Sequence, residues 1–211
     1  MMSSTTSIPI KFIDSLEEKQ HIMLLYEDPQ YARIIEFVFI KRGLERGEEC
    51  IYATPDDTGS TVLMLQRYGI PLDAFLAKKI RVFQIKPSSG THDEIILNCK
   101  QEIQRILADV KIPFRAVLRI VTDVSTVNGI SVELEMEKLA QDCFEELGGT
   151  IMCPYDISEI EKSKKNAWIK SLYSNHHTII YLPKYGEGGV FSPSQNISKT
   201  TSATRNKKRA S

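Results

Sequence analysis

The sequence lacks the marks of several large protein classes. No apolar run approaches the roughly 20 residues that a membrane-spanning helix needs. The segment Met1–Pro9 is rich in serine and threonine and carries no charge, so it resembles neither a secretory signal nor a transit peptide. Only four cysteines occur, with no C-x-x-C pair, which argues against structural zinc and against a disulfide framework. These absences predict a cytoplasmic protein with no membrane partner.

The sequence has no net charge, because 27 basic residues balance 27 acidic ones. The charges are, however, unevenly distributed along the chain. Residues 196–211 hold five basic residues and no acid, which leaves 22 basic against 27 acidic residues elsewhere. A mildly acidic body offers no electrostatic footprint for nucleic acid, so direct nucleic-acid binding is not expected.

The motifs of common enzymes are absent as well. Neither G-x-x-x-x-G-K-[ST] nor G-x-G-x-x-G occurs, and a triphosphate site needs such a glycine loop and a lysine. G-x-S-x-G and H-E-x-x-H are missing too. The glycine cluster Gly186–Gly189 precedes no helical pattern and is interpreted as a flexible loop. We therefore expect no catalytic residues, no cofactor and no bound metal.

What the sequence does contain is a series of short apolar, β-branched runs. Several are apolar on consecutive residues, as strands buried on both faces require. The six runs are His21–Tyr26, Glu49–Thr54, Ile80–Ile85, Arg115–Thr122, Thr150–Tyr155 and His177–Leu182.

Helical patterns separate these runs. They cover about Tyr31–Arg46, the stretch after Asp93, a segment from near Ser131 to Gly148-Gly149, and a segment from Ser158 that includes Trp168. Alternating strands and helices predict an α/β fold, a doubly wound, mainly parallel sheet of about six strands with helices on both faces.

We expect a single folded domain with a flexible segment at each terminus. Residues 1–14 are predicted to be a flexible N-terminal segment, 15–190 the folded domain and 191–211 a disordered basic tail. Ligands of open α/β sheets bind outside the carboxyl ends of the strands. Here those ends carry acidic residues such as Asp28, Asp56 and Asp156.

Individual histidines and cysteines have two interpretations each. His176 and His177 could bind metal, but neighbouring strand residues point to opposite faces, which favours one packed and one solvated ring. Cys153 lies in an apolar strand, where a cysteine is usually a small buried hydrophobe. His21 fits a structural hydrogen bond, and Asp123 fits a cap better than a metal ligand.

Four segments, in order, resemble one family. They are Gln20–Glu27 (Q-H-I-M-L-L-Y-E), Phe39–Tyr52 (F-I-K-R-G-L-E-R-G-E-E-C-I-Y), Met152–Asp156 (M-C-P-Y-D) and Asn175–Ile180 (N-H-H-T-I-I). Together they resemble the MEDS domain, the methanogen/methylotroph DcmR sensory domain, over roughly Ser15–Tyr185.

That family is related to KaiC/RecA-like ATPases, and the resemblance implies the same fold here. The segment Glu27–Tyr31 would stand where the ATPases have their phosphate loop. The segment Val117–Ser125 looks like a Walker B strand, with Asp123 at the acidic position. The resemblance thus implies an ATPase scaffold without its phosphate-binding loop.

The resemblance also implies a function and a site. Members of the family are thought to sense small hydrocarbon derivatives. The implied ligand-binding residues are His21, Tyr26, Cys153, Tyr155, Asp156 and His176. Gln20 replaces the family's usual acid and His177 its usual proline, which puts the ligand chemistry in doubt.

In a RecA-like strand order, the first strand lies between the fifth and the last. His21 and His176 would then be neighbours near the amino ends of their strands, with Cys153 and Tyr155 one strand away. Such a cluster could satisfy its own hydrogen bonds or form a small-molecule pocket, and the sequence does not choose.

Three functions remain open at this point. The first is a sensory domain that binds a small organic ligand and signals through a partner, either a histidine kinase or a transcription regulator, or through a homo-oligomer. The second is a KaiC-like ATP-binding protein with an atypical phosphate site. The third is a component of a transcriptional regulator.

Overall fold

A seven-stranded sheet forms the centre of the protein. The computed structural model describes residues 7–86, 88–119, 126–142, 146, 148–162 and 166–193. The strands are β1 (His21–Tyr26), β2 (Glu49–Thr54), β3 (Ile80–Gln84), β4 (Phe114–Leu118), β5 (Thr150–Asp156), β6 (Thr178–Leu182) and β7 (Gly189–Phe191). Their order is β3-β2-β4-β5-β1-β6-β7, and every pair is parallel except β6 with β7.

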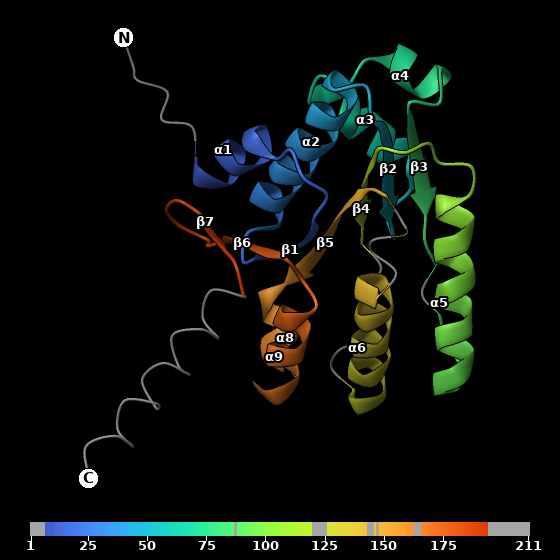
Figure 1. Ribbon diagram of the computed structural model, residues 1–211, viewed down its shortest axis with the longest axis vertical. Helices are drawn as coiled ribbons and strands as arrows, with labels where there is room; N and C mark the ends of the chain where they lie inside the picture. Colours follow the sequence, from blue (N-terminus) through green and yellow to red (C-terminus); the bar gives the residue numbers. More distant parts are fainter. Residues whose placement is uncertain are drawn as a thin grey trace, which may run out of the picture.

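Helices cover both faces of the sheet (Figure 1). One face carries α1 (Ile8–Ser15), α2 (Pro29–Glu45), α3 (Thr58–Arg67) and α4 (Leu72–Leu76). The other carries α5 (His92–Leu107), α6 (Val127–Asp142), α8 (Ile157–Lys162) and α9 (Asn166–Ser174). The prediction of a doubly wound, mainly parallel α/β sheet is confirmed.

The central strand β1 is buried along its whole length, which explains its unbroken apolar run. It lies between β5 and β6, as a RecA-like order requires. Alternation along β1 divides its side chains between two hydrophobic clusters. Ile22, Leu24 and Tyr26 pack with α1, α2 and α3, whereas Met23 and Leu25 pack with α5, α6, α8 and α9.

The N-terminal cap of α2 matches the prediction. Asp28 accepts hydrogen bonds from the amides of Gln30 (2.8 Å) and Tyr31 (3.3 Å), and Pro29 occupies the first turn. The helix predicted from Ser158 differs. The structure has two helices there, α8 and α9, and the cap of α8 is Asp156, whose carboxylate accepts from the amide and the hydroxyl of Ser158.

Four elements were not predicted. Residues 8–14 were expected to be flexible, yet they belong to α1, where Ile13 is fully buried against α2. The prediction failed because the serine- and threonine-rich residues before α1 indicated an unstructured segment, and the apolar pattern of α1 itself is short. Gly189 was predicted to lie in a flexible loop and Phe191 in the disordered tail, but both belong to β7, which pairs with β6 as an antiparallel strand. Helices α3 and α4 were also not specified.

Some predictions fall on residues that the structure does not describe. Asp123 and the end of the Walker B-like segment, Cys143, and the basic tail beyond residue 193 lie outside the described ranges.

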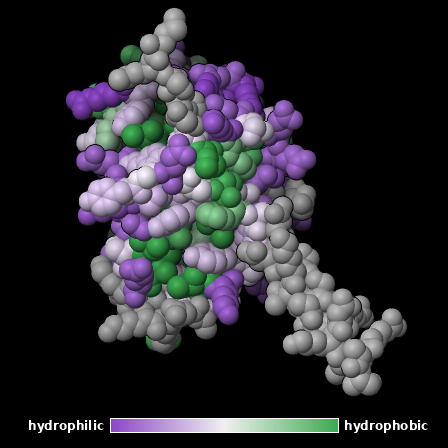
Figure 2. All heavy atoms as spheres, turned by 90° about the vertical axis from the view of Figure 1, so that its left-hand side faces the viewer, coloured by the Kyte–Doolittle hydropathy of each residue, from purple (hydrophilic) through white to green (hydrophobic). Residues whose placement is uncertain are grey.

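The side of the molecule at α1 and β7 carries a band of hydrophobic side chains among polar ones (Figure 2). Its sheet edge is the three-residue strand β7, short enough to offer little backbone for pairing. Within the described ranges, no helix has both the length and the apolar character needed to cross a membrane.

A glycine lets α2 approach the sheet closely. A Cβ on Gly43 would lie 2.8 Å from Cδ of Arg115 and 2.8 Å from Sγ of Cys50. Arg115 is buried, and its Nε donates to Glu48 (2.6 Å). The motif glycine of the Phe39–Tyr52 segment therefore makes room for a buried ion pair beneath α2.

We expect Gly43→Ala to destabilise the fold, because its methyl group would push against a buried arginine and a buried cysteine. Overpacking of this kind lowers the free energy of unfolding by about 1–3 kcal/mol. Urea denaturation followed by circular dichroism measures the change. Gly59→Ala, at an exposed position in the first turn of α3, is the matched control and should lower stability by no more than about 0.5 kcal/mol. Equal stability of both variants would contradict the close approach.

Candidate functional site

A cluster of buried polar side chains lies between the sheet and α6. His21 comes from β1, Cys153 and Tyr155 from β5, and His176 from the residues just before β6. Glu133 and Glu137 come from α6. All six side chains are buried. We refer to them together as the histidine–glutamate cluster.

The centre of the cluster is Oε2 of Glu137. It lies 3.2 Å from Nε2 of His21 and 3.2 Å from Nε2 of His176. Sγ of Cys153 lies 3.5 Å from the same Nε2 of His21. The two imidazole rings are neighbours, with centroids 4.2 Å apart. Four side chains that can ligate a metal thus offer atoms that all lie within 4.8 Å of one another.

Backbone carbonyls orient both rings. Nδ1 of His21 lies 2.8 Å from the carbonyl oxygen of Asn175, and Nδ1 of His176 lies 2.8 Å from that of Leu172. A carbonyl oxygen can only accept, so each Nδ1 carries a hydrogen. Each Nε2 is thereby turned toward Glu137.

Tyr155 holds the other oxygen of Glu137. Its hydroxyl donates to Oε1 of Glu137 and lies 2.6 Å from Oε1 of Glu133. The two glutamates stand one helical turn apart on α6, so both reach the same phenol. Glu137 is therefore bonded through one oxygen to β5 and faces the histidines with the other.

The surroundings shift the pKa values of Glu137, His21 and Cys153. Burial alone would raise the pKa of Glu137, but His176 and His21 overcome it and hold that pKa well below its usual range. Burial would lower the pKa of His21, but the neighbouring carboxylate of Glu137 raises it instead. Burial raises the pKa of the Cys153 thiol, and the charges of both glutamates raise it further. These shifts favour the carboxylate form of Glu137, the protonated form of His21 and the neutral thiol of Cys153.

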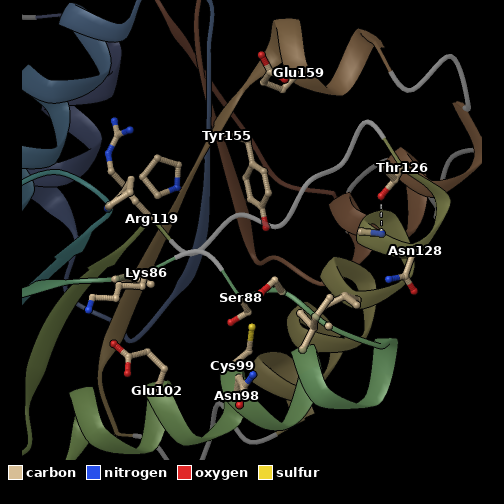
Figure 3. Close-up of a pocket in the computed structure, with 18 of the residues that line it drawn as sticks. Lys86, Ser88, Asn98, Cys99, Glu102, Arg119, Thr126, Asn128, Tyr155 and Glu159 are labelled. Atoms are coloured by element: carbon tan, nitrogen blue, oxygen red, sulfur yellow. Dashed lines mark hydrogen bonds between the residues drawn. The ribbon is translucent and has the colours of Figure 1, made fainter.

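A cavity of about 1190 Å³ opens at the carboxyl ends of the parallel strands. We call it the carboxyl-end cavity. Residues at the ends of β1, β2, β3 and β5 line it, together with side chains of α5 and α6. Figure 3 shows the Tyr155 ring among these residues, between Arg119 on one side and Thr126 and Asn128 on the other. Tyr155 thus belongs both to the cavity wall and to the histidine–glutamate cluster.

The charges of the described lining residues balance. Three are basic and three are acidic: Lys86, Arg105, Arg119, Glu102, Asp156 and Glu159. Several are already engaged, since Arg105 pairs with Glu102, and Arg119 pairs with Glu36. The cavity wall therefore has no surplus of cations for a polyanion among the residues described.

Arg119 connects the cavity to a second polar network on the α2 face. Its Nε donates to Glu36 (3.1 Å), whose carboxylate is fully buried and also accepts from Tyr52. Arg33 donates to the Tyr52 hydroxyl (2.6 Å). Burial and the charge of Glu36 raise the pKa of Tyr52. The network fixes Arg119 at the cavity rim.

The structure brings together four of the six residues named from the sequence, namely His21, Cys153, Tyr155 and His176. Tyr26 and Asp156 lie elsewhere. They are register partners at the carboxyl ends of β1 and β5, and both line the carboxyl-end cavity. Tyr26 packs into the hydrophobic cluster on the α2 face, with Arg119 over its ring.

The two departures from the family motifs lie at the edge of the cluster. Gln20 accepts a hydrogen bond from the hydroxyl of Thr178 (2.6 Å), which joins the amino ends of β1 and β6. His177 accepts through Nδ1 from the backbone amide of His21 (3.0 Å). Neither side chain is among the four that converge at Glu137.

Sequence reasoning missed Glu133 and Glu137. It aligned α6 on the apolar stripe of Val132, Met136 and Leu139, which faces α5. The sheet-facing stripe is a different one and includes Ile130, Glu133, Leu134, Glu137 and Gln141. The sequence did contain a signal for this stripe. Glu133 and Glu137 lie three residues after Ile130 and Leu134, which places all four on the same face of a helix.

Comparisons with known proteins agree on family and fold. The family model described as "MEthanogen/methylotroph, DcmR Sensory domain" matches residues 20–177. A comparison with curated protein sequences found no match. Among solved structures, the KaiC-like protein PH0186 of Pyrococcus horikoshii OT3 is similar, with 14% identity and a TM-score of 0.54 over 81% of this chain and 76% of that one.

A second structure, that of PH0250 from the same organism, has 10% identity and a TM-score of 0.55 over 86% of this chain and 90% of that one. Likeness at such identities shows the fold alone, which is RecA/KaiC-like. The family model spans well over half of the sequence and includes all four motif segments named above, except for residues 178–180 at the end of the last. The chain therefore belongs to the MEDS family of sensory domains.

Proposed function

We propose that this chain is a sensor without catalytic activity, which binds a small organic molecule in the carboxyl-end cavity and reports it to a signalling partner. The observation that carries the proposal is the double position of Tyr155. Its ring lines the cavity and its hydroxyl holds Glu137. A ligand that contacts the ring therefore acts on the histidine–glutamate cluster through one side chain.

The cavity favours a small, uncharged ligand such as the hydrocarbon derivatives that the family resemblance implies. Apolar side chains such as Ile85, Ile95 and Val132 stand beside amides and hydroxyls such as Asn98 and Ser88. Sites of this mixed kind bury the apolar part of a ligand and orient its polar group. The balanced charges give no advantage to an anion.

A nucleotide fits this site poorly. In phosphate-binding loops, backbone amides at a helix N-terminus bind the phosphates. Here the equivalent amides of Gln30 and Tyr31 donate to the Asp28 carboxylate. A phosphate would have to displace that carboxylate and then lie beside it, which favours the sensor over a KaiC-like ATP-binding protein.

The output is proposed to pass to a protein partner, a histidine kinase or a transcription regulator. The route begins at Tyr155 and Glu137, because Glu137 connects α6 to the residues next to β1 and β6. A change in this link would move α6 relative to the amino ends of those strands.

We expect Asn98→Trp to weaken binding of a small organic ligand, because an indole at this exposed lining position would occupy part of the cavity and narrow it. Ligand-observed nuclear magnetic resonance with a panel of short-chain alcohols, amines and halogenated alkanes measures binding. Gln104→Trp is the matched control, since it lies on the same helix α5, is exposed and does not line the cavity. It should bind as the original protein does.

The same preparation should give a flat isothermal titration with Mg-ATP. Micromolar ATP binding, together with no binding from the organic panel, would overturn the sensor proposal. Organic binding that Asn98→Trp leaves unchanged would place the ligand elsewhere.

We expect Tyr155→Phe to lower the free energy of unfolding by about 1–3 kcal/mol, the range for leaving buried polar groups without a partner. The physical reason is that both buried carboxylates lose the phenol hydroxyl. Thermal and urea denaturation measure the change. Tyr185→Phe, at a tyrosine that is 82% exposed, is the control and should be within about 0.5 kcal/mol of the original. A stable Tyr155→Phe protein would show that the hydroxyl link is not formed.

A further inference from the structure

We propose that the histidine–glutamate cluster is a metal site that holds one divalent transition-metal ion of the zinc class. The ligands are Nε2 of His21, Nε2 of His176, Sγ of Cys153 and Oε2 of Glu137. No cofactor or metal was expected from the sequence, and the inference goes beyond the proposed binding of an organic molecule.

The distances between the four atoms carry the proposal. Zinc is bound at about 2.0–2.2 Å by nitrogen and oxygen and at about 2.3 Å by sulfur, so the edges of a tetrahedral site are about 3.3 Å from nitrogen to oxygen and about 3.6 Å from sulfur to nitrogen. The structure has 3.2 Å from Oε2 to each Nε2 and 3.5 Å from Sγ to Nε2 of His21. These three distances match three of the six edges of a tetrahedron around a single ion, and the remaining ligand atoms lie within 4.8 Å of one another.

The directions of the atoms agree with a shared ion. Oε2 of Glu137 and Nε2 of His176 are buried, and within the described chain neither has a hydrogen bond of acceptable geometry, although they lie 3.2 Å apart. Groups this deeply buried normally have such a bond. Two buried polar atoms at ion-pair distance without a hydrogen bond fit ligands of one central cation.

The outer contacts are those of metal-bound histidines. In such sites the second ring nitrogen donates to a carbonyl or carboxylate, which fixes the ring and leaves the first nitrogen as ligand. Nδ1 of His21 and Nδ1 of His176 both meet backbone carbonyls at 2.8 Å. The Tyr155 hydroxyl holds the non-ligating oxygen of Glu137 in the same way.

The donor set selects the class of metal. Two imidazoles, a thiolate and a carboxylate suit zinc or cobalt better than magnesium or calcium, which prefer oxygen. On binding, the Cys153 thiol and any protonated Nε2 lose their protons to solvent as the metal–sulfur and metal–nitrogen bonds form, without a change of oxidation state. A dipositive ion balances the thiolate and the carboxylate, and both histidines bind as neutral rings.

The experiment is a cobalt titration of the reduced, metal-free full chain, followed by absorption spectroscopy. We expect one equivalent of Co²⁺ to produce a thiolate-to-cobalt charge-transfer band and the strong visible bands of tetrahedral cobalt, all bleached by one equivalent of Zn²⁺. Cys153→Ser should lose the charge-transfer band. Cys50→Ser is the matched control, also at a buried cysteine but on the opposite face, and should keep it.

His176→Gln should bind Co²⁺ at least about tenfold more weakly. Zinc should raise the melting temperature of the original chain by about 5 °C or more, because it binds only the folded state. X-ray absorption of the zinc-loaded original protein needs no variant and should find one sulfur among four ligands.

Two results would overturn the proposal: a folded original protein that shows no thiolate-to-cobalt band, or a band that persists in Cys153→Ser. Neither readout uses an organic ligand, so failure of the metal site and failure of the proposed sensing are distinguishable.

Discussion

The buried carboxylate of Glu137 is the constraint on which the rest of the site depends. It lies in the protein interior, where a charge left without a partner costs several kcal/mol. One oxygen meets the Tyr155 hydroxyl from β5, and the other faces His21 at β1 and His176 beside β6. A single side chain of α6 thus connects three adjacent strands. The buried charge of Glu137 is stabilised only when all three strands hold their polar groups against it.

Under the proposed function, this arrangement would let a RecA/KaiC-like fold act as a sensor. The loop between β1 and α2, which would hold phosphates, is closed by the Asp28 cap. The cavity at the carboxyl ends of the strands remains, and its wall includes the ring of Tyr155. A ligand shifts a conformational equilibrium only by contacting two states differently, and Tyr155 provides a contact at which such a difference can arise.

Much of the fold follows from local sequence, whereas the site does so only in part. Strands buried on both faces are recognisable because their apolar residues are consecutive, as in β1. His21, Cys153 and His176 were found through resemblance to a family, because their spacing along the chain carries no metal motif. Glu137 was not found at all. A glutamate on a helix normally faces solvent, and only the packing of α6 against the sheet shows that this one is buried.

The short elements were missed for a different reason. The three residues of β7 and the single apolar turn of α1 have too little local pattern to stand out, and tertiary packing decides their structure. The pair of Arg119 and Glu36 joins residues 83 positions apart, a separation at which one sequence gives no pairing signal.

The most direct test of the account is the imidazole spectrum of the histidines by nitrogen-15 nuclear magnetic resonance, recorded while a cavity-binding organic compound is added. The account predicts that the signals of His21 and His176 shift in proportion to occupancy of the cavity, and that Tyr155→Phe abolishes the shift while the compound still binds. Saturation of the cavity with no change at either histidine would contradict the coupling of cavity and cluster through Tyr155.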